Sequence, residues 1–302
     1  MNNAIYKHQA VNDLAWLFEA PMIVADLDLK PYWLKELPHK LSQLDESPEP
    51  LLDALKRCKS HFLGAYFEVL FSFGIRHFST LEIVLEHQQL INPDGSTLGE
   101  VDMLVTSPEG TVFQFEIALK YFLEVNKGVD TDWIGPNKTD SLSKKTHKAR
   151  TKQLTVLDSA PGKALLKKNE IEETVEPVLL IFGYLFYCGR PINKAVRPQL
   201  EESEHVKWMY FNQFDVDEWG EYCFCELIKP KWITHKKMQS GEIVSYQEVH
   251  QSLTHTFVRD TRPKMYLAWK KCVNEVDLRF NNLMQDHTMQ QPVRIFIVPN
   301  EW

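Results

Sequence analysis

Two carboxylates and an amine lie at strand-like spacing between residues 99 and 120 of the chain. Asp102 closes the segment GEVD, while Glu116 and Lys120 lie in the segment FEIALK. Residues at even spacing along a strand share one face, so Glu116 and Lys120 would project together. Two carboxylates can hold Mg²⁺, which neutralises a phosphate and activates water, and a lysine can position or deprotonate that water. These residue types indicate hydrolysis of a phosphodiester.

Three predicted strands would position these side chains. They cover residues 78–90, 100–106 and 111–121, and turn sequences with Pro and Gly separate them. A short turn makes the second and third strands an antiparallel pair, which brings Asp102 beside Glu116. The third strand gathers large apolar side chains on its other face, which must be buried: Phe113, Phe115, Ile117, Leu119 and Tyr121.

Helical patterns flank the three strands. Apolar residues recur at helical spacing over Leu51–Gly74, and residues Ser141–Asp158 are also helical in character. Val178–Cys188 is apolar throughout, which is typical of a central strand covered on both faces. Elsewhere we expect a helix over Ala10–Phe18, a loop with one helical turn over Leu29–Pro50, a polar loop over Val125–Asp140, a strand over Val206–Phe214, a helix near Pro263–Leu283 and a strand over Val293–Val298.

This order of elements, with GEVD (Gly99–Asp102) and FEIALK (Phe115–Lys120), resembles the PD-(D/E)XK, or restriction-endonuclease-like, nuclease superfamily. More narrowly, the chain is similar to an uncharacterised bacterial protein family placed in that superfamily, through the segments LGAYFEVLFSF, IGPNKTDSLSKK and RIFIVPNEW. The resemblance implies an α/β fold with a mixed central sheet flanked by helices. It implies one domain, with a nuclease-like core at residues 51–214, an N-terminal helical and loop extension at 1–50 and a C-terminal extension at 215–302.

The resemblance also implies roles for individual residues. Asp102 and Glu116 match the two acids of the motif and would bind Mg²⁺ or Mn²⁺, with Glu68 of the preceding helix as a third acid. Gln153 matches a Gln that several exonuclease-like members place near the metal or substrate. The motif has Lys two residues after its second acid, where this chain has Ala118. Lys120 lies two residues later, about 7 Å farther along the strand, and could reach back to the metal, contact a phosphate, or do neither.

The expected partner is nucleic acid, DNA before RNA. Lys144, Lys148 and Lys152 have i, i+4 spacing and form a basic stripe, which is either a solvated face or a surface that contacts phosphates. The net charge of −7 is the wrong sign for coating nucleic acid nonspecifically, but a local basic patch is sufficient for contact. Two other functions remain as alternatives: a catalytically degenerate protein that binds nucleic acid or a partner protein, and a subunit whose acids form only internal salt bridges. The chain could also form a homodimer.

Other classes of function lack support in the 302 residues. The five cysteines are odd in number, and the pair Cys223 and Cys225 is a poor zinc site by itself. The chain has no HExxH, P-loop, GxSxG or glycine-rich dinucleotide motif. No basic leader with an apolar core opens the chain, and the longest apolar run is too short to span a bilayer. We therefore expect a soluble cytoplasmic protein.

Overall fold

The computed structural model describes residues 6–58, 60, 62–127, 130–189, 206–234, 242–270 and 292–302. The chain forms an α/β protein with a large mixed sheet, as predicted. It divides into two compact units. The first unit holds Tyr6–Lys120 and Leu142–Gly183, and the second unit holds Tyr121–Ser141 and Tyr184–Trp302. Two long strands each contribute residues to both units.

The strands of the first unit begin with the predicted antiparallel run of β2 (Glu82–Ile91), β3 (Thr97–Thr106) and β4 (Val112–Lys127). β6 (Val175–Cys188) neighbours β4, and the short β1 (Met22–Ala25) pairs antiparallel with β6. The three predicted strands and the buried central strand are thus confirmed. β4 continues beyond its predicted end, and its last residues belong to the second unit.

The helix predicted over residues 51–74 is two helices, α3 (Glu49–Lys56) and α4 (Leu63–Phe78). A local hydrogen bond helps to interrupt the helical pattern, because the Ser60 hydroxyl accepts from the backbone N–H of Phe62 at 3.2 Å. Short polar side chains compete for backbone groups in this way and favour breaks between helices. The acid Glu68 therefore lies in the second of the two helices.

α1 (Gln9–Leu17) matches the predicted N-terminal helix and packs against α4. The sequence predicts that the second helix ends at Gly74, but α4 continues to Phe78. The contact with α1 gives Gly74 another role. A Cβ atom at Gly74 would lie 3.0 Å from Leu17 Cδ2, so the absent side chain gives α1 room to approach. Gly74 thus serves the packing of two helices and does not terminate one.

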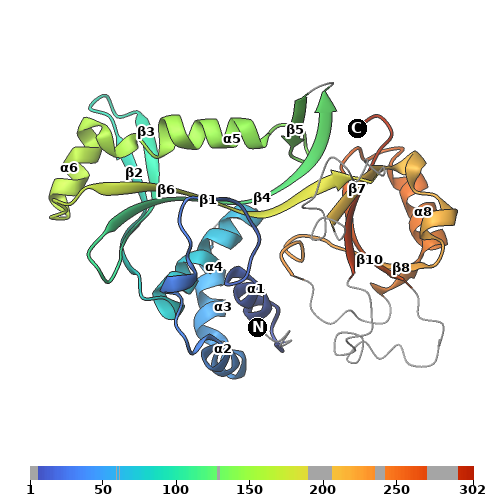
Figure 1. Ribbon diagram of the computed structural model, residues 1–302, viewed down its shortest axis with the longest axis horizontal. Coiled ribbons are helices and arrows are strands. Elements are labelled where there is room, and N and C mark those ends of the chain that lie inside the picture. Colours follow the sequence, from blue (N-terminus) through green and yellow to red (C-terminus); the bar gives the residue numbers. More distant parts are fainter. Residues whose placement is uncertain are drawn as a thin grey trace. The chain divides into compact units, whose positions relative to one another are not determined.

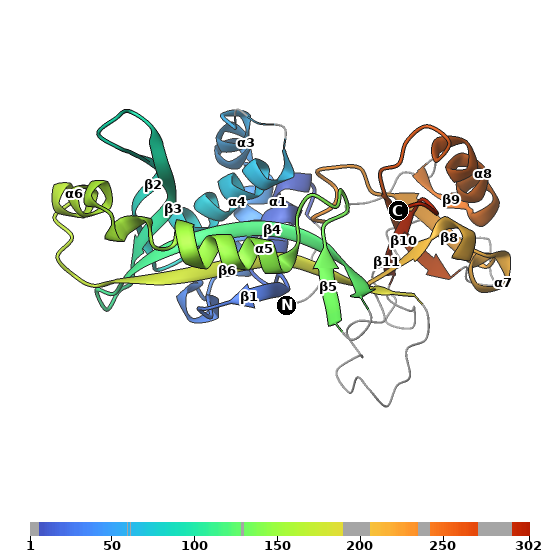
Figure 2. The same cartoon turned by 90° about the horizontal axis from the view of Figure 1, so that it is seen from above.

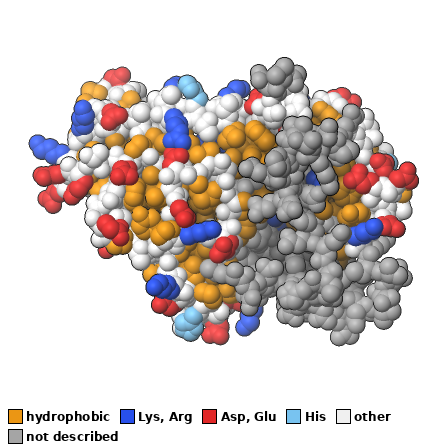
Figure 3. All heavy atoms as spheres, viewed as in Figure 1, with side chains coloured by type: hydrophobic (Ala, Val, Ile, Leu, Met, Phe, Trp, Pro, Cys, Tyr) orange, Lys and Arg blue, Asp and Glu red, His pale blue; other side chains and the backbone are white. Residues whose placement is uncertain are grey.

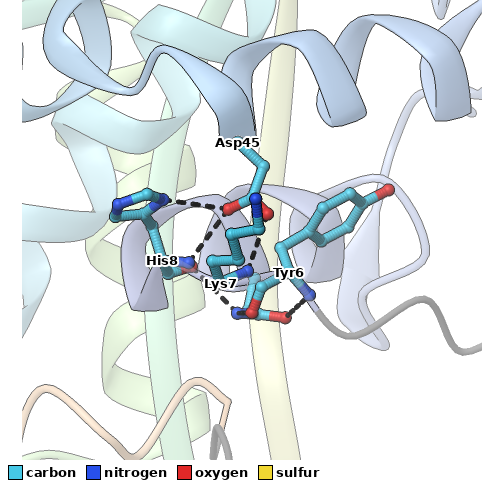
Figure 4. Close-up of polar contacts among 5 residues, drawn as sticks. Tyr6, Lys7, His8 and Asp45 are labelled. Carbon is cyan, nitrogen blue, oxygen red and sulfur yellow. Dashed lines mark hydrogen bonds and ion pairs between the residues drawn. The ribbon is translucent and has the colours of Figure 1, made fainter.

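Residues Leu29–Pro50, predicted as a loop, contain the ten-residue helix α2 (Leu37–Glu46). Proline in its first turn is compatible with a helix, because those N–H groups have no partner within the helix. Figure 4 shows that Asp45 of α2 anchors the chain before α1: its carboxylate accepts from the backbone N–H groups of Lys7 at 2.7 Å and His8 at 2.9 Å. Burial alone would raise the pKa of Asp45, but these hydrogen bonds outweigh it and hold the pKa below its usual range.

Helices cover both faces of the strands in the first unit. Figures 1 and 2 show α1 to α4 on one face and α5 (Leu142–Lys148) with α6 (Ala160–Lys168) on the other. On the first face Phe71 of α4 contacts Phe115 of β4, with ring centroids 6.1 Å apart. On the second face a smaller apolar cluster comprises Ala149, Leu154, Leu179 and Ile181, with Ala118 packed against it. Alternate residues of β4 therefore face different layers, as the sequence predicts.

The strands of the second unit run in the order β7 (Val206–Tyr210), β11 (Val293–Val298), β10 (Lys264–Lys270), β8 (Tyr222–Glu226) and β9 (Val244–Ser245). β7 and β11 are parallel, and the other pairs in this run are antiparallel. The predicted strands at both ends of the segment are confirmed, although the first ends at Tyr210. α7 (Val216–Trp219) and α8 (Tyr246–Thr256) complete the unit, and α8 contributes Val249 and Leu253 to its apolar core.

Two predictions for the second unit were wrong. The helix predicted near Pro263–Leu283 is strand β10 as far as Lys270, and residues 271–283 lie outside the described part of the chain. Four consecutive residues of β10 are buried, as in a strand covered on both faces. The polar loop predicted over Val125–Asp140 contains β5 (Asp130–Ile134), which pairs with the end of β4. Among the helices that the structure describes, none is long and apolar enough to cross a membrane.

Candidate active site

The predicted acid pair lies side by side at the end of the β3–β4 ladder. Backbone pairing runs from Thr106 opposite Val112 to Met103 opposite Phe115, so Asp102 and Glu116 are the next residues on the two strands. The Asp102 carboxylate accepts from the backbone N–H of Ile117 at 3.1 Å, and the two acid side chains are hydrogen-bonded to each other.

Lys145 of α5 supplies the amine of this site. Its Nζ atom lies 2.6 Å from Glu116 Oε1 and 3.4 Å from the Gln153 side-chain oxygen. The side chains of Lys145 and Glu116 are 14% and 4% exposed, so this ion pair is largely removed from water. An amine from the neighbouring helix therefore reaches the acid that the expected lysine at position 118 would have served.

The sequence analysis missed Lys145 because it selected the stripe of Lys144, Lys148 and Lys152. The structure shows all three stripe residues exposed. A signal for Lys145 was present in the apolar residues around it: it lies three residues after Leu142 and four before Ala149, both of which belong to the apolar cluster on the sheet. Residues at i, i+3 and i+7 share a helix face, so this spacing turns Lys145 toward the strands.

Gln153 ends a short π-helical turn, Ala149–Gln153, that follows α5. The turn is marked by a hydrogen bond from Leu154 N to Ala149 O at 2.9 Å. The buried Gln114 of β4 donates to the Gln153 carbonyl at 2.9 Å and thereby ties this turn to the strand that carries Glu116. Such π-turns occur often at functional sites, because they re-aim side chains within a helix. Gln153 was expected near the site, and its side chain indeed contacts Lys145.

The electrostatics of the site favour protonation of its acids. The pKa of Glu116 is raised to about 7, mainly by burial and then by the neighbouring Asp102 carboxylate, while Lys145 opposes both effects. Burial also raises the pKa of Asp102, although the hydrogen bond from Ile117 N–H partly compensates. Two carboxyl groups with raised pKa values thus lie beside one amine, and a bound cation would favour their ionised forms.

Glu68 lies on α4, half-buried, and interacts electrostatically with Glu116 and Lys145. Burial raises its pKa, and so do the charges of Glu100 and Glu116. Within the residues that the structure describes, however, no three His, Cys, Asp or Glu side chains are grouped closely enough to hold a metal ion together. The structure therefore brings together the pair of Asp102 and Glu116 and leaves Glu68 outside a common ligand cluster.

The chemistry of the pair fits a hard divalent cation. Mg²⁺ prefers oxygen ligands, keeps several waters and is commonly bound through one or two carboxylates. Asp102 and Glu116 supply oxygen ligands of that kind from two adjacent strands. Two carboxylates are sufficient, so the position of Glu68 does not exclude binding.

Lys120 lies four residues beyond Glu116 on β4 and is half-buried. Its carbonyl oxygen borders Gly183 of β6, where a Cβ atom would lie 1.8 Å from that oxygen. Gly183 also has a φ of 126°, in a region that favours glycine. The backbone of Lys120 therefore has a packing role. Its amine could still reach the metal, contact a phosphate, or do neither, as the sequence analysis left open.

A family model described as a domain of unknown function, DUF1853, matches residues 12–298 of the chain. No curated protein and no solved structure matches the chain.

Proposed function

The chain belongs to the DUF1853 family, a domain of unknown function, and we propose that it is a metal-dependent nuclease with a restriction-endonuclease-like core. The observation that carries the proposal is the contact of three groups from three elements: Asp102 of β3, Glu116 of β4 and Lys145 of α5. The two acids match the motif, but the position at which the motif has a lysine is Ala118 in this chain. Lys145 lies where it can take the part of the lysine that the motif has at the position of Ala118.

The order of elements around the site also supports the proposal. The helix α4 precedes β2, β3 and β4, and α5 and β6 follow them. This is the order of helix, three strands, helix and strand on which the resemblance rests. The two acids lie on adjacent antiparallel strands, and the amine enters from the helix that covers the same face.

Asp102 and Glu116 would hold the metal ion, Mg²⁺ or Mn²⁺. When bound, such an ion neutralises charge on a phosphate and lowers the pKa of a coordinated water. Lys145 holds Glu116 through a charged hydrogen bond and favours its ionised form. Gln153 contacts Lys145 from the π-helical turn and orients its amine. Glu68 adds negative charge near the site without being one of the two ligands.

DNA is the proposed substrate, with RNA second. Lys144, Lys148 and Lys152 are exposed on the helical segment that also carries Lys145, and this exposed basic segment would contact the phosphates. On the face drawn in Figure 3, basic and acidic side chains are interspersed. Contact with a polyanion would therefore depend on local groups such as these lysines and not on the total charge of −7.

A cleavage assay tests the proposal. Labelled single-stranded DNA, duplex DNA and RNA are incubated with the protein in Mg²⁺, in Mn²⁺ and in EDTA. Glu116→Gln is compared with Glu109→Gln, which makes the same change at an exposed residue of the β3–β4 turn. We expect metal-dependent products from wild type and Glu109→Gln, and none from Glu116→Gln. Products that are equal in both variants would contradict the assignment.

The second candidate function is a binding module that retains the fold without cleavage. The hydrogen-bonded acid pair and the ion pair to Lys145 favour it, because these contacts satisfy the acids within the protein itself. It predicts nucleic-acid binding that persists in Glu116→Gln, with no product in any metal. If the acids form only internal salt bridges, Mn²⁺ would also leave the melting temperature unchanged.

A further inference from the structure

The second unit contains a cavity of about 700 Å³ at the ends of β4, β6 and β7. This volume is within the range of small-molecule sites, roughly 300–1,000 Å³. Its lining includes a buried acid, two aromatic rings and four side-chain amides, and none of the lining residues is Lys, Arg or His. A site with this composition suits a polar, uncharged ligand and disfavours a free phosphate.

Two of the amides present hydrogen-bond donors. Asn300 accepts from the backbone N–H of Asn212 at 2.8 Å, and Gln213 accepts from the backbone N–H of Tyr210 at 3.2 Å. A backbone N–H can only donate, so the atom it meets must be the amide oxygen in each case. The oxygens of Asn300 and Gln213 are thus engaged, and the NH₂ groups are the part of each amide left to meet a ligand.

Glu124 places a carboxylate in the same wall. Its side chain is 1% exposed and accepts from the backbone N–H of Cys188 at 3.2 Å. A carboxylate accepts hydrogen bonds from ligand N–H groups and repels anions. The wall therefore discriminates between a ligand with N–H groups and one with only negative oxygens.

The aromatic part of the lining is held in place before any ligand binds. Trp208 donates its indole N–H to the Glu124 carbonyl at 2.9 Å and contacts Tyr210 edge to face, with centroids 5.2 Å apart. The ring centroids of Trp302 and Trp208 are 5.3 Å apart, and the indole N–H of Trp302 donates to the Pro136 carbonyl. Tyr210 is half-buried, so part of its surface can contact a planar ligand.

We infer that this cavity binds a nucleobase, and that guanine fits it best. Guanine presents adjacent acceptors, O6 and N7, and the NH₂ groups of Asn300 and Gln213 can donate to acceptors of this kind. Guanine also carries N–H donors that suit the Glu124 carboxylate, whereas adenine and cytosine lack the ring N–H beside a carbonyl. Base stacking on aromatic side chains is widespread in nucleic-acid-binding proteins. The inference rests on the second unit alone and does not require cleavage at Glu116.

Binding of free nucleosides to the full chain tests this inference. Guanosine, adenosine, cytidine, uridine, glucose and inorganic phosphate are titrated separately by calorimetry, with saturation-transfer NMR as a second measurement. Every titration is repeated with Glu116→Gln in EDTA, so failure of the proposed nuclease activity leaves the test intact. We expect guanosine to bind most tightly, and equally in this variant. Binding of phosphate or glucose in preference to guanosine, or no nucleoside binding at millimolar concentration, would overturn the inference.

Substitution of the amides supplies the second part of the test. Gln213→Glu keeps the oxygen that accepts from Tyr210 N–H but replaces the NH₂ donor with an acceptor. We expect guanosine affinity to fall about tenfold or more. Gln251→Glu is the matched control, because it makes the same change at an exposed residue of α8, and its affinity should not change. If Gln213→Glu does not fold, Asn300→Asp makes the same exchange, and unchanged affinity in either folded variant would refute the assignment.

Discussion

The Nζ atom of Lys145 lies 2.6 Å from Glu116 Oε1, in an ion pair whose two side chains come from a helix and a strand of the first unit. In the proposed nuclease, this contact would account for the departure of the sequence from the motif that it resembles. The strand position that would carry a lysine is Ala118, and it packs instead against the apolar cluster beneath the helix. The amine is supplied from α5, so the acid and the amine need not share a strand.

Replacing Lys145 with Met should strongly reduce the proposed nuclease activity. An amine that positions water or a phosphate oxygen contributes on the order of 10²–10⁴-fold to rate, so we expect kcat to fall by about 100-fold or more. Lys163→Met, at an exposed position of α6, should change kcat by less than about threefold. Initial rates of cleavage of labelled DNA measure the difference. A Lys145→Met protein that cleaves at the wild-type rate would remove the amine from the mechanism.

Stability of the same variant should depend on pH. Removing Lys145 leaves Glu116 buried without its amine at alkaline pH, and an uncompensated buried charge costs several kcal/mol. At acid pH Glu116 is protonated, because burial already raises its pKa to about 7 in the presence of Lys145. We therefore expect Lys145→Met to lose more stability near pH 8 than near pH 5 in urea denaturation. An equal loss at both pH values would indicate that Lys145 contributes only through packing.

The contribution of Glu116 to the stability of the wild-type protein should fall as the pH rises from about 4.5 to about 7. The pKa of Glu116 is raised from 4.5 to about 7, so between these values the folded protein keeps a proton that the unfolded chain has released. The contribution of Glu116 is therefore most favourable below pH 4.5 and is lost as the pH approaches 7. The difference in pKa corresponds to roughly 3 kcal/mol.

Glu116→Gln isolates this effect because glutamine stays neutral. We expect its free energy of unfolding to rise by about 2–3 kcal/mol relative to wild type when the pH is raised from about 5 to about 8. Urea denaturation of both proteins at each pH measures the change. Glu109→Gln, at an exposed turn, should show no such trend. A relative stability that does not change with pH would show that Glu116 titrates near its ordinary pKa.

Gly183 should be among the positions of the first unit least tolerant of a side chain. Its φ of 126° disfavours other residues, and a Cβ atom would lie 1.8 Å from the Lys120 carbonyl oxygen. We expect Gly183→Ala to lower the free energy of unfolding by more than about 3 kcal/mol. Gly64 of α4 has nothing within 4 Å of such an atom, so Gly64→Ala should stabilise the protein by about 0.5 kcal/mol. Thermal and urea denaturation compare the two variants, and similar losses would contradict the packing argument.

The hairpin of β3 and β4 could be predicted from sequence because its signals are local. The alternation of Phe113, Phe115 and Ile117 with polar residues determines which side of β4 meets α4. The turn between the strands then fixes the register that brings Asp102 to Glu116. Both signals operate within some twenty residues, so they survive without knowledge of the rest of the fold.

The amine and several elements could not be predicted in this way. Consecutive lysines precede the π-helical turn, and only the packing of Leu142 and Ala149 on the sheet selects Lys145. β10 was predicted as a helix because its apolar run is ambiguous until β8 and β11 are known to pair with it on both sides. The orientation of Lys145 and the strand conformation of β10 depend on contacts with residues that are distant in sequence. The spacing of residues within one segment therefore does not predict them.

Binding of Mn²⁺ should stabilise the protein through Asp102 and Glu116. A ligand that binds only the folded state raises the free energy of unfolding, by about 2.7 kcal/mol at 100 times Kd, and therefore raises the melting temperature. The acids must ionise to bind the ion, and burial raises the pKa of both, that of Glu116 to about 7. The melting temperature should therefore rise more on addition of Mn²⁺ near pH 8 than near pH 6.

Substitution of the two acids tests which residues hold the ion. Asp102→Asn and Glu116→Gln should abolish the rise in melting temperature, while Glu109→Gln should preserve it. Glu68→Gln is the informative fourth variant, because Glu68 lies outside a common ligand cluster with the pair. A small reduction is expected there, and complete loss would make Glu68 a third ligand that joins the pair when the ion binds.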